Sequence, residues 1–316
     1  MYTRVQARLQ SRQPILLDGA LGSELVRRGV RWRKHGLLTD AAAVEQLHGE
    51  YLAAGAEVLR TNTFQLNPRI YLNVFRNREH MRHIGAPGLE ELTPRLLRIA
   101  VQLARQARAK ADGEGTVAIA GVLSPLEHCF RPDLAPPAEQ ARREHEAMAR
   151  VFAEEKVDLL LLESMNTIAE ARVALAAGRA AGLPVWVSFV LGPEGELLSG
   201  EPLQKAVAEM ERDGADAVLV NCAPPEDVTR ALEKLQHCCT LPFGGFAQIG
   251  RFSPPSWKFE FFPQFVDTED WPATRYAAEA ERWLARGATI LGGCCGTSPA
   301  HIATLRASLS VEGRSP

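Results

Sequence analysis

Short apolar runs alternate with longer amphipathic stretches along almost the whole chain. Three of the amphipathic stretches end at Gly55, Gly214 and Gly287, each followed by alanine and then by an apolar run. Glycine tolerates the left-handed backbone that ends a helix, so each glycine marks a change from helix to strand. The runs are apolar on both faces, which indicates strands covered on both sides. Strands are predicted at 15–18, 58–61, 117–122, 159–163, 185–190, 217–222, 242–246 and 289–293.

The stretches between these strands have the apolar spacing of amphipathic helices. One helix is predicted at 40–54, where Asp40 is a favourable N-cap residue. Its apolar face comprises Val44, Leu47, Tyr51 and Leu52. The other helices are predicted at 138–156, 167–181, 202–213, 226–236, 274–286 and 299–308.

Strands that alternate with helices over short connections are typical of a parallel α/β fold. Eight such units in 316 residues predict a closed (β/α)8 TIM barrel that forms a single domain over residues 1–316. An open, doubly wound sheet fits less well, because no Gly-x-Gly-x-x-Gly turn follows the first strand. Two longer segments, at 65–89 and 250–272, are expected to be insertions at the barrel mouth.

Three cysteines follow predicted strands. Cys222 ends the sixth strand, and Cys294 and Cys295 follow the eighth within a Gly-Gly-Cys-Cys-Gly-Thr sequence. The C-terminal ends of barrel strands share one face, so we expect the three thiols to converge there. Three sulfur ligands with one free position describe an open zinc site. The alternatives are inert packing and a redox pair, but no Cys-x-x-Cys motif is present and adjacent cysteines would form a strained ring.

A zinc ion with three thiolate ligands favours one particular reaction. Such a metal is suited to holding a further soft ligand, and a bound substrate thiol stays deprotonated and nucleophilic at neutral pH. We therefore expect attack of a substrate thiolate on an activated carbon. Hydrolysis would more typically use histidine and carboxylate ligands with a general base. The remaining cysteines, Cys129, Cys238 and Cys239, are interpreted as inert packing residues.

Polar residues also end several predicted strands. Asp18 and Glu163 are candidates for binding a substrate ammonium group through charged hydrogen bonds, although either could instead cap the following helix. Gly19 lies in a turn whose backbone amides could receive a carboxylate. Neutral hydrogen bonds to the substrate could come from Asn62, Thr63 and Asn221, for which ordinary loop structure is the alternative.

Composition narrows the class of protein. Hydrophobic residues make up 46% of the chain and charged residues 23%, the balance of an ordinary globular enzyme. A net charge of −2 gives no electrostatic basis for binding nucleic acid. No apolar stretch reaches the ~20 residues of a membrane span. Six cysteines in a chain of this length do not suggest a secreted disulfide scaffold, so a cytoplasmic location is expected.

Five motifs resemble the homocysteine S-methyltransferase family. They are Asp-Gly-Ala-x-Gly-Ser-Glu-Leu from 18, Thr-Asn-Thr-Phe-Gln from 61, Glu-Ser-Met from 163 followed by Glu-Ala from 170, Val-Asn-Cys from 220, and the double-cysteine sequence from 292. The resemblance implies a (β/α)8 barrel in which Cys222, Cys294 and Cys295 bind zinc. It further implies that homocysteine accepts a methyl group at its sulfur to give methionine. Asp18 and Glu163 fall at positions that bind the homocysteine amino group in relatives.

The identity of the methyl donor depends on other features of the chain. By length the chain resembles stand-alone enzymes that use S-methylmethionine or S-adenosylmethionine. It departs from relatives at 242–248, where they usually have a Tyr-Pro-Asn-like sequence, and in the aromatic segment at 250–272. Aromatic faces there could hold a cationic donor, or the rings could attach long loops to the barrel. The alternatives are a module served by a separate corrinoid or folate protein, a thiol methyltransferase with a different acceptor, and a non-catalytic regulator.

Overall fold

The computed structural model describes residues 1–30, 36–69, 79, 82, 88–111, 113–192, 195–253, 264–266 and 268–312. Eight parallel strands form one sheet in the order β1-β10-β7-β6-β5-β4-β3-β2. The sheet closes where Leu17 pairs with Val58 in a parallel bridge. The predicted (β/α)8 barrel is therefore confirmed. Its strands are β1 (Ile15–Leu16), β2 (Val58–Arg60), β3 (Ala118–Leu123), β4 (Leu159–Met165), β5 (Val185–Val190), β6 (Ala217–Asn221), β7 (Phe243–Phe246) and β10 (Ile290–Leu291).

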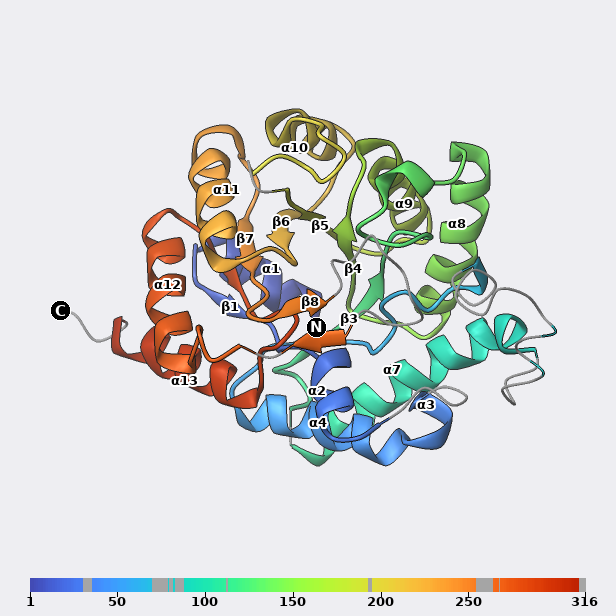
Figure 1. Ribbon diagram of the computed structural model, residues 1–316, viewed down its shortest axis with the longest axis horizontal. Coiled ribbons are helices and arrows are strands. Elements are labelled where there is room, and N and C mark those ends of the chain that lie inside the picture. The colour runs from blue at the N-terminus through green and yellow to red at the C-terminus, as the bar shows by residue number, and fades with distance from the viewer. Residues whose placement is uncertain are drawn as a thin grey trace.

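Helices surround the strands (Figure 1). Each predicted helix is present, and α7 (Thr93–Lys110) is a further long helix that our prediction did not include. At the start of α4, Asp40 occupies the N-cap position, but its side chain makes no capping bond. The other helices are α1 (Tyr2–Gln10), α2 (Gly22–Arg27), α3 (Gly36–Thr39), α4 (Ala41–Ala53), α8 (Ala138–Glu154), α9 (Ile168–Ala180), α10 (Leu203–Arg212), α11 (Pro225–Cys238), α12 (Ala273–Ala285) and α13 (Pro299–Glu312), with 3-10 turns η1 (Leu89–Leu92) and η2 (Pro132–Leu134).

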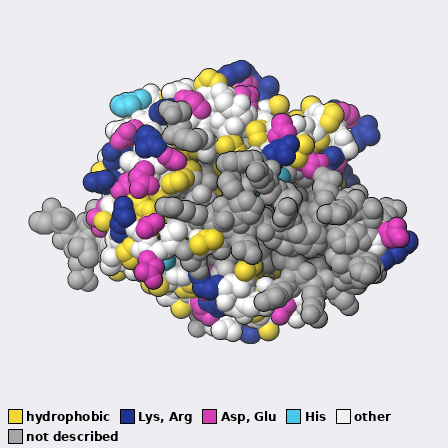
Figure 2. All heavy atoms as spheres, in the orientation of Figure 1, with side chains coloured by type: hydrophobic (Ala, Val, Ile, Leu, Met, Phe, Trp, Pro, Cys, Tyr) yellow, Lys and Arg dark blue, Asp and Glu magenta, His cyan; other side chains and the backbone are white. Residues whose placement is uncertain are grey.

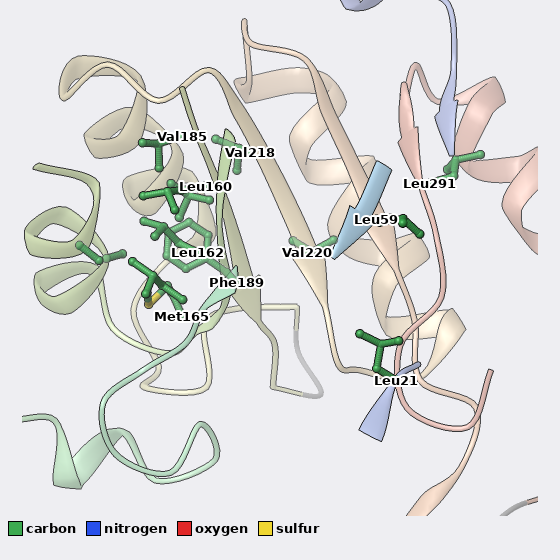
Figure 3. Packing of buried hydrophobic residues seen from close by; sticks show 14 of the residues in the cluster. Leu21, Leu59, Leu160, Leu162, Met165, Val185, Phe189, Val218, Val220 and Leu291 are labelled. Atoms are coloured by element: carbon green, nitrogen blue, oxygen red, sulfur yellow. The ribbon is translucent and has the colours of Figure 1, made fainter. Parts of the chain in front are cut away.

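The alternation of side chains along each strand divides the core into two parts. In β4, Leu160 and Leu162 belong to the layer between sheet and helices, whereas Leu159 and Leu161 belong to the barrel interior. Figure 3 shows Leu160, Leu162 and Val185 lying between the strands and neighbouring helices. Both faces of each strand are thus buried, as the two-sided apolar runs predicted.

Helix α1 closes the N-terminal end of the barrel. Its Val5 and Leu9 are buried in the interior cluster together with Ile15 and Val58, the first residues of β1 and β2. Trp186 donates a hydrogen bond from Nε1 to the hydroxyl of Tyr2 at 3.3 Å. The opposite end, where the strands finish, is left for the functional residues.

The seventh strand approaches its neighbours unusually closely. A Cβ atom added at Gly244 would lie 1.8 Å from the carbonyl oxygen of Ile290 in β10. One added at Gly245 would lie 2.7 Å from Cγ1 of Val228 in α11. The Gly-Gly pair within 242–248 therefore has a packing reason: only glycine lets β7 fit between β10 and the helix layer at this separation.

The two predicted mouth insertions are described in part. Residues 70–78, 80–81 and 83–87 of the first lie outside the described residues. So do residues 254–263 and 267 of the second, which include Trp257, Phe259, Phe261 and Phe262. Around the latter gap, β8 (Arg251–Ser253) and β9 (Gln264–Val266) pair antiparallel in front of the barrel strands (Figure 1).

The outer surface carries charges of both signs. Lys and Arg side chains are interspersed with Asp and Glu on the face visible in Figure 2. Many of them pair along or between helices, such as Arg172 with Asp213 at 2.6 Å. Within the described part of the chain, no helix is long and apolar enough to cross a membrane.

Candidate metal centre

Three cysteines converge at the C-terminal end of the barrel. The sulfur atoms of Cys222, Cys294 and Cys295 all lie within 4.8 Å of one another, and those of Cys294 and Cys295 are 4.0 Å apart. Cys222 directly follows β6, and the other two follow β10. These strands are not neighbours, because β7 lies between them. The three thiols therefore converge as predicted, and they meet across the C-terminal end of β7.

The backbone is fixed at both sides of the cluster. Cys222 has a φ of 53°, in the left-handed region that non-glycine residues seldom adopt. The N–H of Cys294 donates to the carbonyl of Ala247 at 2.9 Å, and the N–H of Ile249 donates to the carbonyl of Cys295 at 2.9 Å. The hydroxyl of Thr297 donates to the carbonyl of Cys294 at 2.7 Å. These bonds join the double-cysteine loop to the segment after β7 and aim its sulfurs toward Cys222.

The three thiols share protons unequally. Hydrogen bonds from the thiols of Cys222 and Cys295 lower the pKa of Cys294 well below its ordinary value, and the positive charge of Arg60 acts in the same direction. Bonding to Cys294 and Cys295, together with burial, raises the pKa of Cys222. One sulfur in the cluster is therefore readily ionised, which suits a site that binds a cation.

The donor set fits a soft divalent metal. Tetrahedral zinc with Zn–S bonds of about 2.3 Å requires sulfurs about 3.8 Å apart, close to the spacing of this cluster. Cys222 and Cys294 are buried and Cys295 is half-buried, so a metal here would be largely shielded from water. The three cysteines thus form a candidate metal site. Among the described residues, Cys129, Cys238 and Cys239 do not join it.

An arginine lies between Asp18 and Glu163, the two carboxylates that were predicted to bind a substrate ammonium group. Arg60, the last residue of β2, donates from Nε to Asp18 Oδ1 at 2.6 Å and from Nη1 to Glu163 Oε2 at 3.1 Å. Its backbone N–H donates to Asp18 Oδ2 at 2.9 Å. All three side chains are buried. The structure therefore brings Asp18 and Glu163 together around a cation that the chain itself supplies.

Burial and charge act in opposite directions on this group. Burial raises the pKa of Asp18, whereas the charge of Arg60 lowers it. Burial likewise raises the pKa of Glu163 to about 7, again opposed by Arg60 and reinforced by the nearby Cys294. A buried acid that titrates near neutrality beside a metal-type cluster marks a candidate functional site.

Asn221 lies at the junction between the carboxylates and the cysteines. Its amide nitrogen donates to Ser164 Oγ at 2.7 Å and lies 3.9 Å from the sulfur of Cys294. Its carbonyl oxygen accepts from Ser188 Oγ at 2.7 Å. The side chain is completely buried, so its evident structural contribution is to hold the ends of β4, β5 and β6 together.

The other predicted substrate contacts surround this junction. Thr63 is buried and donates from Oγ1 to the carbonyl of Val122 at 2.8 Å, while Asn62 is half-buried. Gly19 is packed so closely that a Cβ would lie 2.8 Å from the ring of Tyr51. Direct contact between any of these residues and a substrate remains a prediction.

Two residues of the site were missed by sequence analysis. Arg60 could have been noticed as a charged residue in an otherwise apolar strand, since buried arginine is rare unless it is paired. Gln248, within the unusual 242–248 segment, accepts from the thiol of Cys222 through Oε1 at 3.6 Å. No spacing rule pointed to it, because its position depends on the path of the chain after β7. One face of Trp271, an aromatic residue of the 250–272 segment that could contact the donor, is covered by Arg275, whose guanidinium carbon lies 4.0 Å from the ring centre.

The chain is similar in sequence to several homocysteine S-methyltransferases. Homocysteine S-methyltransferase of Escherichia coli (strain K12) is 27% identical over 96% of this chain and 97% of that protein. Betaine–homocysteine S-methyltransferase 1 of Bos taurus is 27% identical over 96% of this chain and 74% of that protein. S-methylmethionine–homocysteine S-methyltransferase of Rattus norvegicus is 26% identical over 96% and 81%, respectively.

A solved structure and a family profile extend the likeness to the whole barrel. The metallated form of the homocysteine methyltransferase MmuM from Escherichia coli has a TM-score of 0.77 and 25% identity, covering 96% of this chain and 99% of that chain. The profile of the homocysteine S-methyltransferase family matches residues 15–309, which include all three clustered cysteines. The chain therefore belongs to the homocysteine S-methyltransferase family.

Proposed function

We propose that this protein is a zinc-dependent enzyme that transfers a methyl group from a small cationic donor to the thiol of homocysteine, giving methionine. The observation that carries the proposal is the cluster of three sulfur atoms at the mouth of a barrel of this family. S-methylmethionine and S-adenosylmethionine are the favoured donors. Relatives are named for both betaine and S-methylmethionine, so the donors must be tested separately.

Cys222, Cys294 and Cys295 would hold the metal and leave one position for the acceptor. When bound, zinc would keep the acceptor sulfur as a thiolate at neutral pH. Asn221 orients Cys294, since its amide lies 3.9 Å from that sulfur. Because Cys222 and Cys294 are buried and Cys295 is half-buried, the site would limit the access of water to a sulfur bound there, which would preserve its nucleophilicity.

Most of the remaining predicted site residues would bind the rest of the acceptor. In this proposal Glu163, Asn62 and Thr63 line the acceptor site from the ends of β2 and β4, with the turn at Gly19 beside them. Asp18 and Asn221 lie deeper and are fully buried. They act mainly by fixing their neighbours.

The test begins with metal content and activity. Purified protein should contain about one zinc per chain and form methionine from homocysteine with one of S-methylmethionine, S-adenosylmethionine, betaine or methyltetrahydrofolate, each supplied alone. Cys222→Ala should lose the metal and more than about 100-fold of the activity, because a direct ligand matters more than an outer-shell contact. Cys239→Ala is the matched control and should keep both. A Cys222→Ala protein that retains metal and turnover would disprove the proposal.

The same assay decides between the proposal and its alternatives. Turnover with a free small donor excludes a module that depends on a separate corrinoid or folate protein. Methionine formation only after such a protein is added would replace our proposal with that one.

We also propose a cytoplasmic location, because clustered free thiols persist in reducing surroundings. Cell fractionation that finds the protein only outside the cytoplasm would contradict it.

A further inference from the structure

The side chain of Arg60 points into the barrel, directly beside the candidate metal centre. It follows Val58 by two residues on β2 and therefore shares the inward face of that strand. Its guanidinium carbon lies 4.9 Å from the centre of the Phe246 ring. Its Nη2 donates to the carbonyl of Gly293, the residue before Cys294, at 2.7 Å.

The guanidinium is almost fully used by the chain. Besides Gly293, Nη2 contacts the carbonyls of Asp18 and Gly19 at 3.0 and 2.7 Å. Nε and Nη1 are bonded to the carboxylates of Asp18 and Glu163. A planar group held from several directions is fixed in place rather than waiting for a ligand. Arg60 is thus a built-in cation of the site.

Two carboxylates beside a thiol-binding centre would be natural receptors for the ammonium group of an amino-acid acceptor. At Asp18 this role is already filled, because both of its oxygens accept from Arg60 and none of its surface is exposed. Glu163 has one oxygen committed to Arg60. An ammonium group brought to this position would also meet the positive charge of Arg60, and like charges at close range repel.

We propose that Arg60 occupies the ammonium-binding position between Asp18 and Glu163, so that the site accepts short thiols whether or not they carry an amino group. The acceptor class is then a small thiol carboxylate, of which homocysteine is one member. Arg60 becomes a residue that determines specificity. This inference rests on the proposed function, since it concerns the thiol bound at the same metal centre.

The test compares homocysteine with 4-mercaptobutyrate, which is the same molecule without its amino group. Each thiol is titrated calorimetrically into zinc-loaded protein without a methyl donor, and the dissociation constants are compared. A charged hydrogen bond changes a dissociation constant about 10- to 150-fold. We expect the two constants to agree within about tenfold. A larger preference for homocysteine would overturn the inference and leave the proposed function intact.

Failure of the proposed function looks different. A zinc-loaded protein that binds neither thiol, or a protein that holds no zinc, would overturn the proposed function and this inference together. The ratio of methylation rates for the two thiols, measured with whichever donor is active, gives an independent second readout and is expected to stay within the same tenfold range.

Variants at Arg60 test the assignment directly. Arg60→Met should free the carboxylates and increase the preference for homocysteine over 4-mercaptobutyrate at least tenfold. Arg60→Lys keeps a cation at the position and should retain the wild-type ratio. Because both thiols are measured on the same folded fraction, a loss of stability cancels in the ratio. An unchanged ratio in Arg60→Met would refute the inference, and if that variant does not fold, the wild-type and Arg60→Lys ratios decide it.

Discussion

Replacing Arg60 with methionine removes a buried cation while keeping much of its apolar stem in the barrel. The variant leaves Asp18 and Glu163 facing each other without the guanidinium that now bridges them at 2.6 and 3.1 Å. Both carboxylates lie where water has little access. The expected result is a strong loss of stability in the metal-free protein.

The size of this loss follows from the two ion pairs. Unit charges ~4 Å apart at an effective dielectric constant of ~20 attract by about 4 kcal/mol. Removing the guanidinium also removes its own cost of burial, which returns part of that energy. Breaking a buried pair by deleting one partner typically destabilises a protein by about 3–5 kcal/mol. We expect a value in this range for Arg60→Met at pH 7.5.

The deficit should depend on pH. The native pKa of Glu163 is already raised from 4.5 to about 7, and loss of Arg60 raises it further. At pH values above the pKa of Glu163 in the unfolded chain, the native state of the variant binds more protons than the unfolded state, so the stability of the variant falls as the pH rises. The variant should therefore be closer to wild type at pH 5 than at pH 7.5.

Urea unfolding of the metal-free proteins at the two pH values measures both effects. Arg8→Met is the matched control, since Arg8 pairs with Glu57 near the surface and Glu57 also has Arg306 at 3.6 Å. That control should lose no more than about 1 kcal/mol. If Arg60→Met were no less stable than Arg8→Met, the argument that Arg60 compensates buried charge would be wrong.

Two further predictions concern the scaffold. His48 in α4 is fully buried with no hydrogen-bond partner at either ring nitrogen, and burial lowers its pKa from 6.5 to about 4. Between pH 6.5 and pH 4 the native state therefore binds fewer protons than the unfolded state. The protein should lose about 3 kcal/mol of stability as the pH falls through this range. Urea unfolding across that range should show a weaker pH dependence for His48→Leu, and an unchanged dependence would contradict the assignment. Gly244→Ala should cost about 3 kcal/mol or more by thermal unfolding, because its Cβ would overlap a backbone carbonyl oxygen. Gly49→Ala, with open space at the Cβ position in a helix, should instead gain about 0.5–1 kcal/mol, and equal effects would refute the packing argument.

The strands and most helices could be predicted because local signals are strong in this chain. Buried parallel strands are apolar on both faces, and glycines such as Gly55, Gly214 and Gly287 adopt the positive φ that ends helices. Helix α7 was missed although Leu96, Ala100 and other buried residues have helical spacing. It follows a segment without clear periodicity, which obscured its start.

The cysteine cluster was predictable and its surroundings were not. Strand ends of a barrel share one face, so Cys222 and the double cysteine had to lie on the same side. The strand that separates them, and with it the position of Gln248, is determined by pairing between strands that are distant in sequence. Local sequence patterns do not predict that pairing. The role of Arg60 was missed for a related reason. Arg60 pairs with Asp18 and Glu163, and only the closed sheet brings these three residues together.

Helix α1 offers a practical route for attaching the protein to a sensor surface. It covers the end of the barrel opposite the cysteines, so a tag joined ahead of Tyr2 would anchor the molecule with its catalytic face toward the solution. Such a fusion would remove the terminal ammonium that lies 3.5 Å from Asp158. That carboxylate would still have Arg108 at 3.3 Å, so immobilised protein should bind ligands as freely as protein in solution.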